Sequence, residues 1–214
     1  MRVDLNIGSR NGEGPGVRLE EVALLHEACL PNATTTRLGI GFLGSLYRYF
    51  EKSESELLVV AQGDDGLAGC AVLSFEPKDV GKRLIFGTSI LPSAILRPRI
   101  LFKLAAGSGG SDPEDASCSD GQTNPELLYI FTDATYRGRG VGKRLVAELD
   151  AQMRTLHLNS YVTATLDDPE NPAIEFYRKS GFTPVASVVR HGRQFATLKR
   201  RLISAGNECE RVQS

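Results

Sequence analysis

The fold is decided by the stretch Ala134–Val146, which reads ATYRGRGVGKRLV. It combines three glycines with three arginines and one lysine, and then continues into apolar residues. Glycine lets the backbone take positive φ and approach a ligand closely, and the N-terminal end of a helix attracts anions. Apolar residues recur at helical spacing from Val141 to Met153, which predicts a helix over 140–156. The stretch therefore predicts an anion-binding loop that suits a pyrophosphate.

Two common nucleotide-binding motifs do not fit this loop. A dinucleotide fingerprint needs a third glycine, but Lys143 occupies its position. A P-loop needs Ser or Thr after its lysine, but Arg144 follows here and Arg137 stands where the first glycine belongs. An RNA-binding Arg-Gly segment is disfavoured because this loop opens an amphipathic helix instead of lying in a polar tract. The pattern that remains is Arg137-x-x-Gly140-x-Gly142 between a strand and a helix.

Hydrophobic periodicity predicts a mixed order of strands and helices along the chain. Expected strands cover 3–7, 56–62, 67–75, 127–132, 160–166, 183–190 and 194–202, and expected helices cover 17–30, 35–53, 140–156 and 171–180. We expect a helical insert over 79–106 and a flexible surface loop over 107–125, which is rich in Gly, Ser and Asp. This order predicts a single α/β domain over 1–203 with a polar tail over 204–214.

The composition excludes several broad classes of protein. The chain has 214 residues, 25 basic and 26 acidic, so its formal net charge of -1 argues against a nucleic-acid partner. The N-terminus lacks a signal-peptide pattern, and no apolar run is long enough to span a membrane. The four cysteines form no CxxC pair and fit neither a zinc site nor a disulfide framework, so we expect free thiols, no metal site and a cytoplasmic location.

A second motif lies at 171–182, which reads NPAIEFYRKSGF. It resembles the later helix of the GNAT acetyltransferase superfamily, and Arg137-x-x-Gly140-x-Gly142 resembles the signature Arg/Gln-x-x-Gly-x-Gly/Ala of that family. The two motifs are separated by one helix and one strand, as in the family. The resemblance implies an α/β fold with a mostly antiparallel central sheet flanked by helices, and acetyl-CoA as co-substrate.

The resemblance also implies which residues hold acetyl-CoA. The backbone of Ile130, Phe131 and Thr132 pairs with the pantetheine arm as an added strand would, and one N–H polarises the acetyl carbonyl. Asn171 hydrogen-bonds the pantetheine region. The pyrophosphate lies on the loop residues, which are Arg137, Gly138, Arg139, Gly140, Val141, Gly142, Lys143 and Arg144.

Two side chains are expected to move protons. Glu126 stands at the start of the central strand and matches the glutamate base of some family members, while Asp133 at the end of that strand is the runner-up. A strand-end carboxylate that faces solvent is the alternative for Glu126. Tyr177 matches the usual general acid, which protonates the departing thiolate, and simple core packing is the alternative. No role in catalysis is expected for the three histidines or for Cys118.

The acceptor is less defined than the donor. The expected function is transfer of an acetyl group to a primary amine of a small molecule, with an amino sugar or sugar nucleotide preferred. That preference rests on a resemblance of the segments 42–47 and 91–101 to a subgroup associated with bacterial polysaccharide gene clusters. A protein N-terminus or lysine as acceptor and a non-catalytic CoA-binding module are the alternatives. The insert 79–106 is expected to pack on the core, form a homodimer surface or contact a lipid-linked substrate.

Overall fold

The computed structural model describes residues 3–8, 18–81, 83, 124–190 and 192–202. All but the last two residues of the expected loop 107–125, and most of the expected insert 79–106, therefore lie outside the described residues. The strands are β1 (Val3–Gly8), β2 (Glu56–Gly63), β3 (Gly66–Ser74), β4 (Glu126–Thr132), β5 (Ser160–Leu166), β6 (Phe182–Arg190) and β7 (Arg193–Arg201). The helices are α1 (Leu19–Cys29), α2 (Ile40–Lys52), α6 (Val141–Thr155) and α7 (Pro172–Lys179), with short 3-10 turns η1 (Thr36–Leu38), η2 (Pro77–Asp79) and η3 (Ala134–Tyr136).

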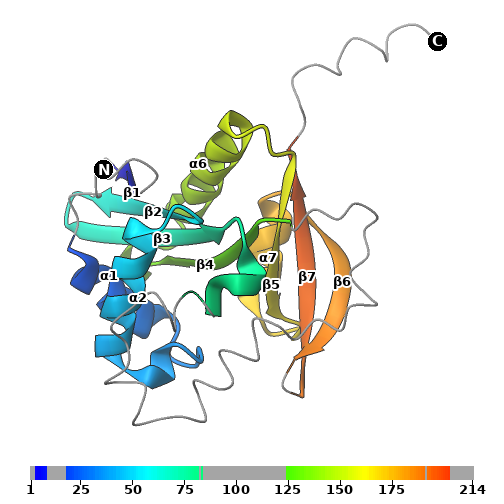
Figure 1. The fold of residues 1–214 in the computed structure, drawn as a ribbon, viewed down its shortest axis with the longest axis horizontal. Helices are drawn as coiled ribbons and strands as arrows, with labels where there is room; N and C mark the ends of the chain where they lie inside the picture. Colours follow the sequence, from blue (N-terminus) through cyan, green and yellow to red (C-terminus); the bar gives the residue numbers. More distant parts are fainter. Residues whose placement is uncertain (1–2, 9–17, 82, 84–123, 191, 203–214) are drawn as a thin grey trace, which may run out of the picture.

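All seven strands join one sheet in the order β1-β2-β3-β4-β5-β7-β6. Every neighbouring pair is antiparallel except β4 and β5, which are parallel. Figure 1 shows β1 to β4 running across the picture and β5, β7 and β6 standing nearly upright, so the sheet twists strongly between its halves. The predicted fold class, a mixed and mostly antiparallel sheet flanked by helices, is confirmed.

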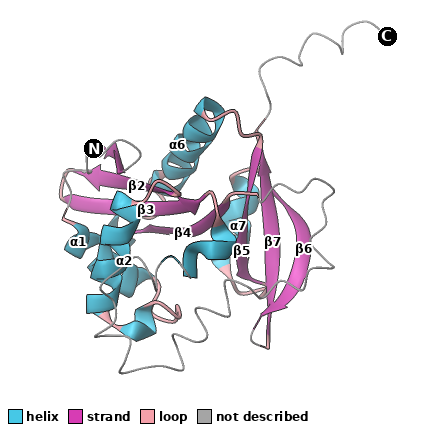
Figure 2. Ribbon diagram, in the orientation of Figure 1, coloured by secondary structure: helices cyan, strands magenta, loops and turns pink. Residues whose placement is uncertain are grey.

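Helices cover both faces of the first half of the sheet (Figure 2). One apolar cluster joins α1 and α2 to one face and includes Val22, Leu43, Leu46 and Phe50. The second cluster joins α6 and α7 to the other face and includes Leu145, Leu149, Met153, Tyr161 and Leu198. Because β2 and β3 are covered on both sides, most of their residues are buried.

One element prediction was wrong. The expected helix over 35–53 is broken at Gly39, whose φ of 92° and ψ of 167° lie outside helical geometry. The chain makes the turn η1 before Gly39 and begins α2 at Ile40. Glycine adopts this backbone without the steric penalty that a Cβ would impose. The helical spacing of apolar residues in the sequence therefore runs across a point where the helix itself is interrupted.

Candidate active site

The glycine-rich loop leaves β4 and enters α6. Asp133 starts the turn η3 because its Oδ1 accepts the Thr135 N–H at 2.8 Å, and this hydrogen bonding with Thr135 lowers the pKa of the Asp133 carboxyl. Tyr136 is buried, and its hydroxyl accepts the Asp65 N–H at 3.0 Å. A side chain at Gly63 would collide with the Tyr136 ring. The hairpin β2–β3 thus fixes the entry to the loop.

Beyond Tyr136 the backbone turns through two glycines with positive φ. Gly138 has φ 73° and Gly140 has φ 81°, and no atom lies within 4 Å of a Cβ built on either one. Gly140 is the N-cap of α6 in left-handed conformation. The conformation explains why glycine is needed at both positions, and the open space beside them leaves room for a ligand.

Several backbone amides of this loop could bind an anion. Arg139 donates its backbone N–H to Tyr136 and Arg144 donates to Gly140, at 3.3 and 3.1 Å. Within the described chain, no backbone acceptor is found for the amides of Gly138, Gly140, Val141, Gly142 and Lys143. Helix geometry leaves such first-turn N–H groups unpaired, and the helix dipole adds partial positive charge. Arg137, Arg139, Lys143 and Arg144 are exposed and surround these donors with full charges.

The parallel strands β4 and β5 pair only near their N-terminal ends and then diverge. They pair only through Glu126 with Val162 and Leu127 with Thr163, although β4 continues to Thr132 and β5 to Leu166. A register shift against β3 places a bulge at Leu128, where the parting begins. The segment of β4 that contains Ile130, Phe131 and Thr132 therefore has an edge toward β5 that no strand pairs with, although the Thr132 carbonyl accepts from Cys29 Sγ and Arg137 Nε, both at 3.4 Å.

Tyr177 lies at the closed end of this opening. Its hydroxyl is 3.4 Å from Thr163 Oγ1, which donates to the Leu127 carbonyl at 3.1 Å. Thr163 has one hydroxyl proton, which goes either to that carbonyl or to the Tyr177 oxygen, and at 3.4 Å the Tyr177 hydroxyl is held only weakly. Burial raises the pKa of Tyr177, which keeps the phenol protonated at neutral pH. The Tyr177 ring also packs in the α6/α7 cluster, so the residue is part of the core and lies at the opening at the same time.

Glu126 lies on the opposite face of the sheet from Tyr177. It pairs in register with Ser74 on β3 and Val162 on β5, so these side chains share one face. The next residue, Leu127, packs in the α6/α7 cluster, whereas Glu126 acts electrostatically on Tyr129 of the α1/α2 cluster. The candidate base and the candidate acid are therefore brought to two sides of the same junction, where β4 and β5 separate.

The Asn171 side chain makes three hydrogen bonds within the protein. Its Oδ1 accepts the Ala173 N–H at 3.1 Å and caps α7, while its Nδ2 donates to Thr165 Oγ1 at 3.0 Å and to the Leu166 carbonyl at 2.6 Å. Both amide protons are thus used to tie α7 to the end of β5. This geometry positions Tyr177 two helical turns later and leaves the Asn171 side chain little capacity for a ligand.

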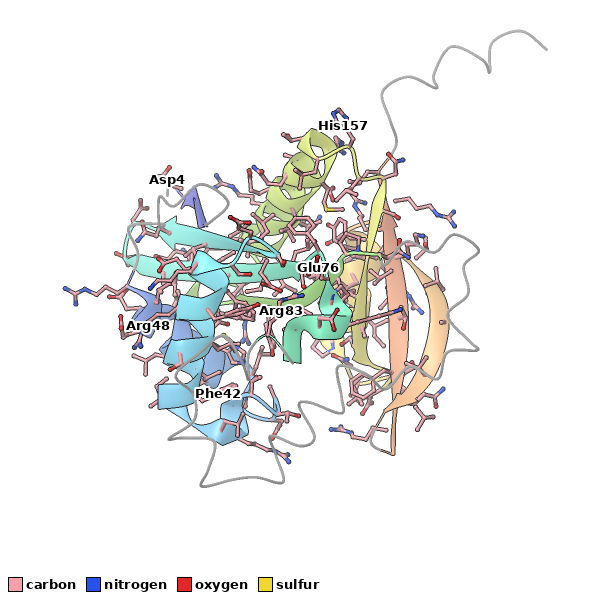
Figure 3. All side chains as sticks on the ribbon, in the orientation of Figure 1. Asp4, Phe42, Arg48, Glu76, Arg83 and His157 are labelled. Carbon is pink, nitrogen blue, oxygen red and sulfur yellow. The ribbon has the colours of Figure 1, made fainter. Side chains whose placement is uncertain are left out.

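Two polar groups beside the site were missed from the sequence. His26 is buried, with Nδ1 2.6 Å from the Tyr47 hydroxyl and Nε2 3.3 Å from Thr35 Oγ1, and burial lowers its pKa to about 4. Arg83 pairs with buried Glu56 at 2.5 Å and with Glu76 at 2.7 Å. Figure 3 labels Arg83 and Glu76 near the middle of the molecule, where the halves of the sheet meet. Helical spacing identified none of these contacts, because they join segments far apart in the sequence.

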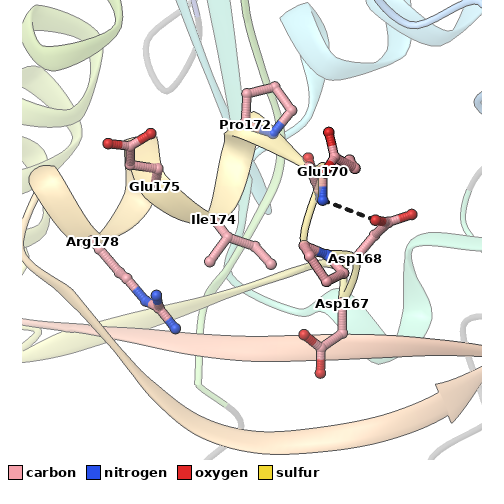
Figure 4. Close-up of a pocket in the computed structure, with 9 residues that line it drawn as sticks. Asp167, Asp168, Glu170, Pro172, Ile174, Glu175 and Arg178 are labelled. Atoms are coloured by element: carbon pink, nitrogen blue, oxygen red, sulfur yellow. Dashed lines mark hydrogen bonds between the residues drawn. The ribbon is translucent and has the colours of Figure 1, made fainter.

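A separate cavity of about 440 Å³ lies at the start of α7 (Figure 4). It is lined by Asp167, Asp168, Glu170, Glu175 and Arg178 among others, and the Glu170 N–H donates to Asp168 Oδ1 at 2.9 Å. Of the predicted site residues only Asn171 lines it. In the described part of the chain, no helix has the length and apolarity to cross a membrane, and no group of acidic, His and Cys side chains could hold a metal.

Comparison with known proteins agrees with this geometry. Residues 103–182 match the model of the Acetyltransferase (GNAT) family. Similar solved structures include an N-acetyltransferase from Staphylococcus aureus Mu50, with 16% identity, coverage of 91% of this chain and 99% of that chain, and a TM-score of 0.58. The ribosomal-protein-S18-alanine N-acetyltransferase from Escherichia coli has 10% identity, 97% and 98% coverage, and a TM-score of 0.57.

A Bacillus subtilis acetyltransferase in complex with CoA has 15% identity, covers 94% of this chain and 100% of that chain, and gives a TM-score of 0.51. At these identities the structures share the fold with this chain. No curated protein sequence matches it closely enough to count as a relative. The family match includes the glycine loop, α6, β5 and α7 in full. Residues 103–182 of the chain therefore match the GNAT acetyltransferase family, and the rest of the described chain shares the fold of the solved acetyltransferases.

Proposed function

We propose that this chain transfers the acetyl group of acetyl-CoA to a primary amine of a small molecule, with an amino sugar or sugar nucleotide as the preferred class. The observation that carries the proposal is the opening between β4 and β5. It has unpaired loop amides at one end, Tyr177 at the closed end and Glu126 on the opposite face. Thioester aminolysis needs these three elements, since it requires a held donor, a base and an acid.

The donor would enter from the side of α6. The amides of Gly138, Gly140, Val141, Gly142 and Lys143 hold the pyrophosphate, with nearby Arg137, Arg139 and Arg144 adding charge. The pantetheine arm lies along the unpaired edge of Ile130, Phe131 and Thr132, as an added strand would. The thioester thereby reaches the face that carries Glu126. Asn171 contributes by fixing α7, through the hydrogen bonds described above.

The reaction then balances with two proton transfers. An acceptor bound as an ammonium first loses one proton to solvent, and Glu126 takes the second proton from the nitrogen as its bond to carbon forms, directly or through water. The amine nitrogen bonds to the carbonyl carbon while a β4 N–H stabilises the carbonyl oxygen, and the carbon–sulfur bond breaks. Tyr177 gives its proton to the departing thiolate, which leaves as CoA thiol. After the reaction Glu126 releases its proton to solvent and the Tyr177 phenolate takes one up. Asp133 is the second candidate base, but hydrogen bonds from Thr135 lower its pKa and make it a weaker base than an ordinary aspartate.

An amine panel tests the proposal. The purified chain is mixed with acetyl-CoA and amino sugars, sugar nucleotides, amino acids, polyamines or N-terminal peptides, and free thiol and the acetylated product are measured. Transfer to small amines is expected, whereas transfer to peptides alone would replace the small acceptor by a protein N-terminus. Absence of both acetyl-CoA binding and transfer would contradict the proposal.

A glycine pair tests the binding loop. Gly140→Asp should raise the Kd for acetyl-CoA at least about 10-fold, because it adds a side chain and a negative charge where the pyrophosphate would lie. Gly192→Asp is the matched control, since Gly192 also has positive φ (75°) and open space around it but lies in the β6–β7 turn. Equal weakening by both variants would show that backbone strain alone causes the effect.

A further inference from the structure

The sheet face that carries Glu126 continues across the second half of the sheet. Glu126 pairs with Val162 on β5, and Val162 pairs with Lys199 on β7, so the three side chains form one row on one face. The row crosses the sheet below the bulge, where β4 and β5 are still paired. Neighbouring strands are about 4.8 Å apart, so the backbone positions of Glu126 and Lys199 are roughly 10 Å apart.

No helix of the described chain covers this part of the face. The contacts of α1 and α2 with the sheet concentrate on β2, β3 and β4, while α7 packs with the cluster on the other face. The residues that share the open face on β5 and β7 are all only half-buried, namely Val162, Ala164, Leu166, Phe195, Thr197 and Lys199. This surface therefore lies beside the candidate base, on the side where an acceptor must approach.

Lys199 has an unusual environment among the basic residues of this region. Its neighbours on the same face are Val162, Thr183 and Thr197, none of which is acidic. Within the described chain, the side chain of Lys199 makes no ion pair and no hydrogen bond. By contrast, Arg83 is neutralised by Glu56 and Glu76. A half-buried ammonium without a counter-charge gains free energy when an anion joins it.

We propose that Lys199 selects the acceptor by pairing with an anionic group that the acceptor carries, a carboxylate or a phosphate. The inference rests on the proposed function, because it places the acceptor amine at Glu126. An extended lysine side chain spans much of the roughly 10 Å between Lys199 and Glu126, so a compact acceptor can contact both side chains. Lys199 contacts the part of the acceptor remote from the reaction and is a specificity-determining residue. The exposed Arg201, further along the same face, adds positive charge to this side.

Matched acceptor pairs test the role of Lys199. The value of kcat/KM is measured for glucosamine 6-phosphate against glucosamine, and for alanine against alaninamide, with release of CoA thiol as the readout. The enzymes are the wild type, Lys199→Gln, Lys199→Arg and the control Lys52→Gln, which removes an exposed lysine at the end of α2. Ratios between variants cancel the different intrinsic reactivities of the amines.

The wild type should prefer the anionic member of at least one pair, and the pair that responds identifies phosphate or carboxylate. Lys199→Gln should lower kcat/KM for that member about 10-fold and change the neutral member less than about twofold, because a charge-assisted hydrogen bond is lost only with the anion. Lys199→Arg should retain most of the preference, and Lys52→Gln all of it. The KM for acetyl-CoA should be the same in all four enzymes.

The outcomes separate this inference from the proposed function. Amines that are acetylated without preference for the anionic member, or equal losses for both members in Lys199→Gln, overturn the role of Lys199 and leave the acetyltransferase activity standing. A wild type that acetylates peptides and no small amine overturns the small-molecule acceptor, and the inference is lost with it.

Discussion

At the scale of single residues, Tyr177 gives the sharpest test of chemistry. Tyr177→Phe should lower kcat about 100-fold, because it removes the proton for the leaving thiolate. It should change the Kd for acetyl-CoA less than about twofold and the free energy of unfolding by about 1 kcal/mol at most, since the hydroxyl makes only a 3.4 Å contact with Thr163.

Tyr161→Phe is the matched control for that variant. Tyr161 lies on the same face of the sheet, and its hydroxyl donates to buried Asp150 at 2.9 Å. Its loss should lower the free energy of unfolding by about 1–3 kcal/mol but leave kcat nearly unchanged. Stopped-flow thiol release and urea unfolding separate the two effects. If Tyr177→Phe retains full kcat, the tyrosine is only a packing residue.

The sequence predicted single residues well where backbone conformation or a motif required them. The positive φ of Gly138 and Gly140 follows from the glycine pattern, because other residues rarely adopt it. The internal role of Asn171 did not follow, since an N-cap and a ligand contact use the same amide group. The buried contact of His26 with Tyr47 also could not be predicted, because it depends on how α1 packs against α2.

At the scale of elements, Gly142 couples α6 to α7. A Cβ at Gly142 would lie 2.9 Å from the Phe176 ring, closer than real contacts allow. Gly142→Ala should lower the free energy of unfolding by about 1–3 kcal/mol, and Phe176→Leu should relieve part of this loss. Thermal unfolding of both single variants and the double variant gives the coupling energy, which should be at least about 1 kcal/mol.

Gly41→Ala serves as the control for helix propensity. Gly41 also lies in the first turn of a helix, α2, but no atom lies within 4 Å of its built Cβ. Alanine should therefore stabilise the chain there by up to about 1 kcal/mol. Stabilisation by Gly142→Ala as well would contradict the close packing of α6 on Phe176.

Most elements could be predicted from hydrophobic period, and their boundaries moved by few residues. The arrangement of β6 and β7 could not, because β7 enters the sheet between β5 and β6 and sequence neighbours give no sign of that order. The parting of β4 from β5 was not predicted, and the bulge at Leu128 that accompanies it has no glycine or proline to mark it. Tertiary packing decides these features.

At the scale of the whole molecule, the two faces of the sheet divide the work. The α6/α7 face holds the proposed donor loop and Tyr177, whereas the opposite face holds Glu126, Lys199 and the buried group around His26. The opening between β4 and β5 joins the faces, so a donor on one face can meet an acceptor on the other. Each half of the sheet contributes one strand to this opening, and the stability of both halves therefore matters for activity.

His26 makes the free energy of unfolding depend on pH. Burial lowers its pKa from the ordinary 6.5 to about 4, so between these values the unfolded chain binds a proton that the folded chain excludes. The contribution is fully present above pH 6.5 and is lost as the pH falls toward 4, with a total of about 3 kcal/mol.

His26→Gln should be less stable at pH 7 because the contacts with Tyr47 and Thr35 are disturbed, but its stability should fall less between pH 6.5 and 4 than that of the wild type. His157→Asn, in which asparagine tolerates the φ of 56°, should keep the wild-type pH dependence. Urea unfolding of the three proteins across this pH range measures the difference, and parallel curves for His26→Gln and the wild type would show that His26 is protonated in the folded chain.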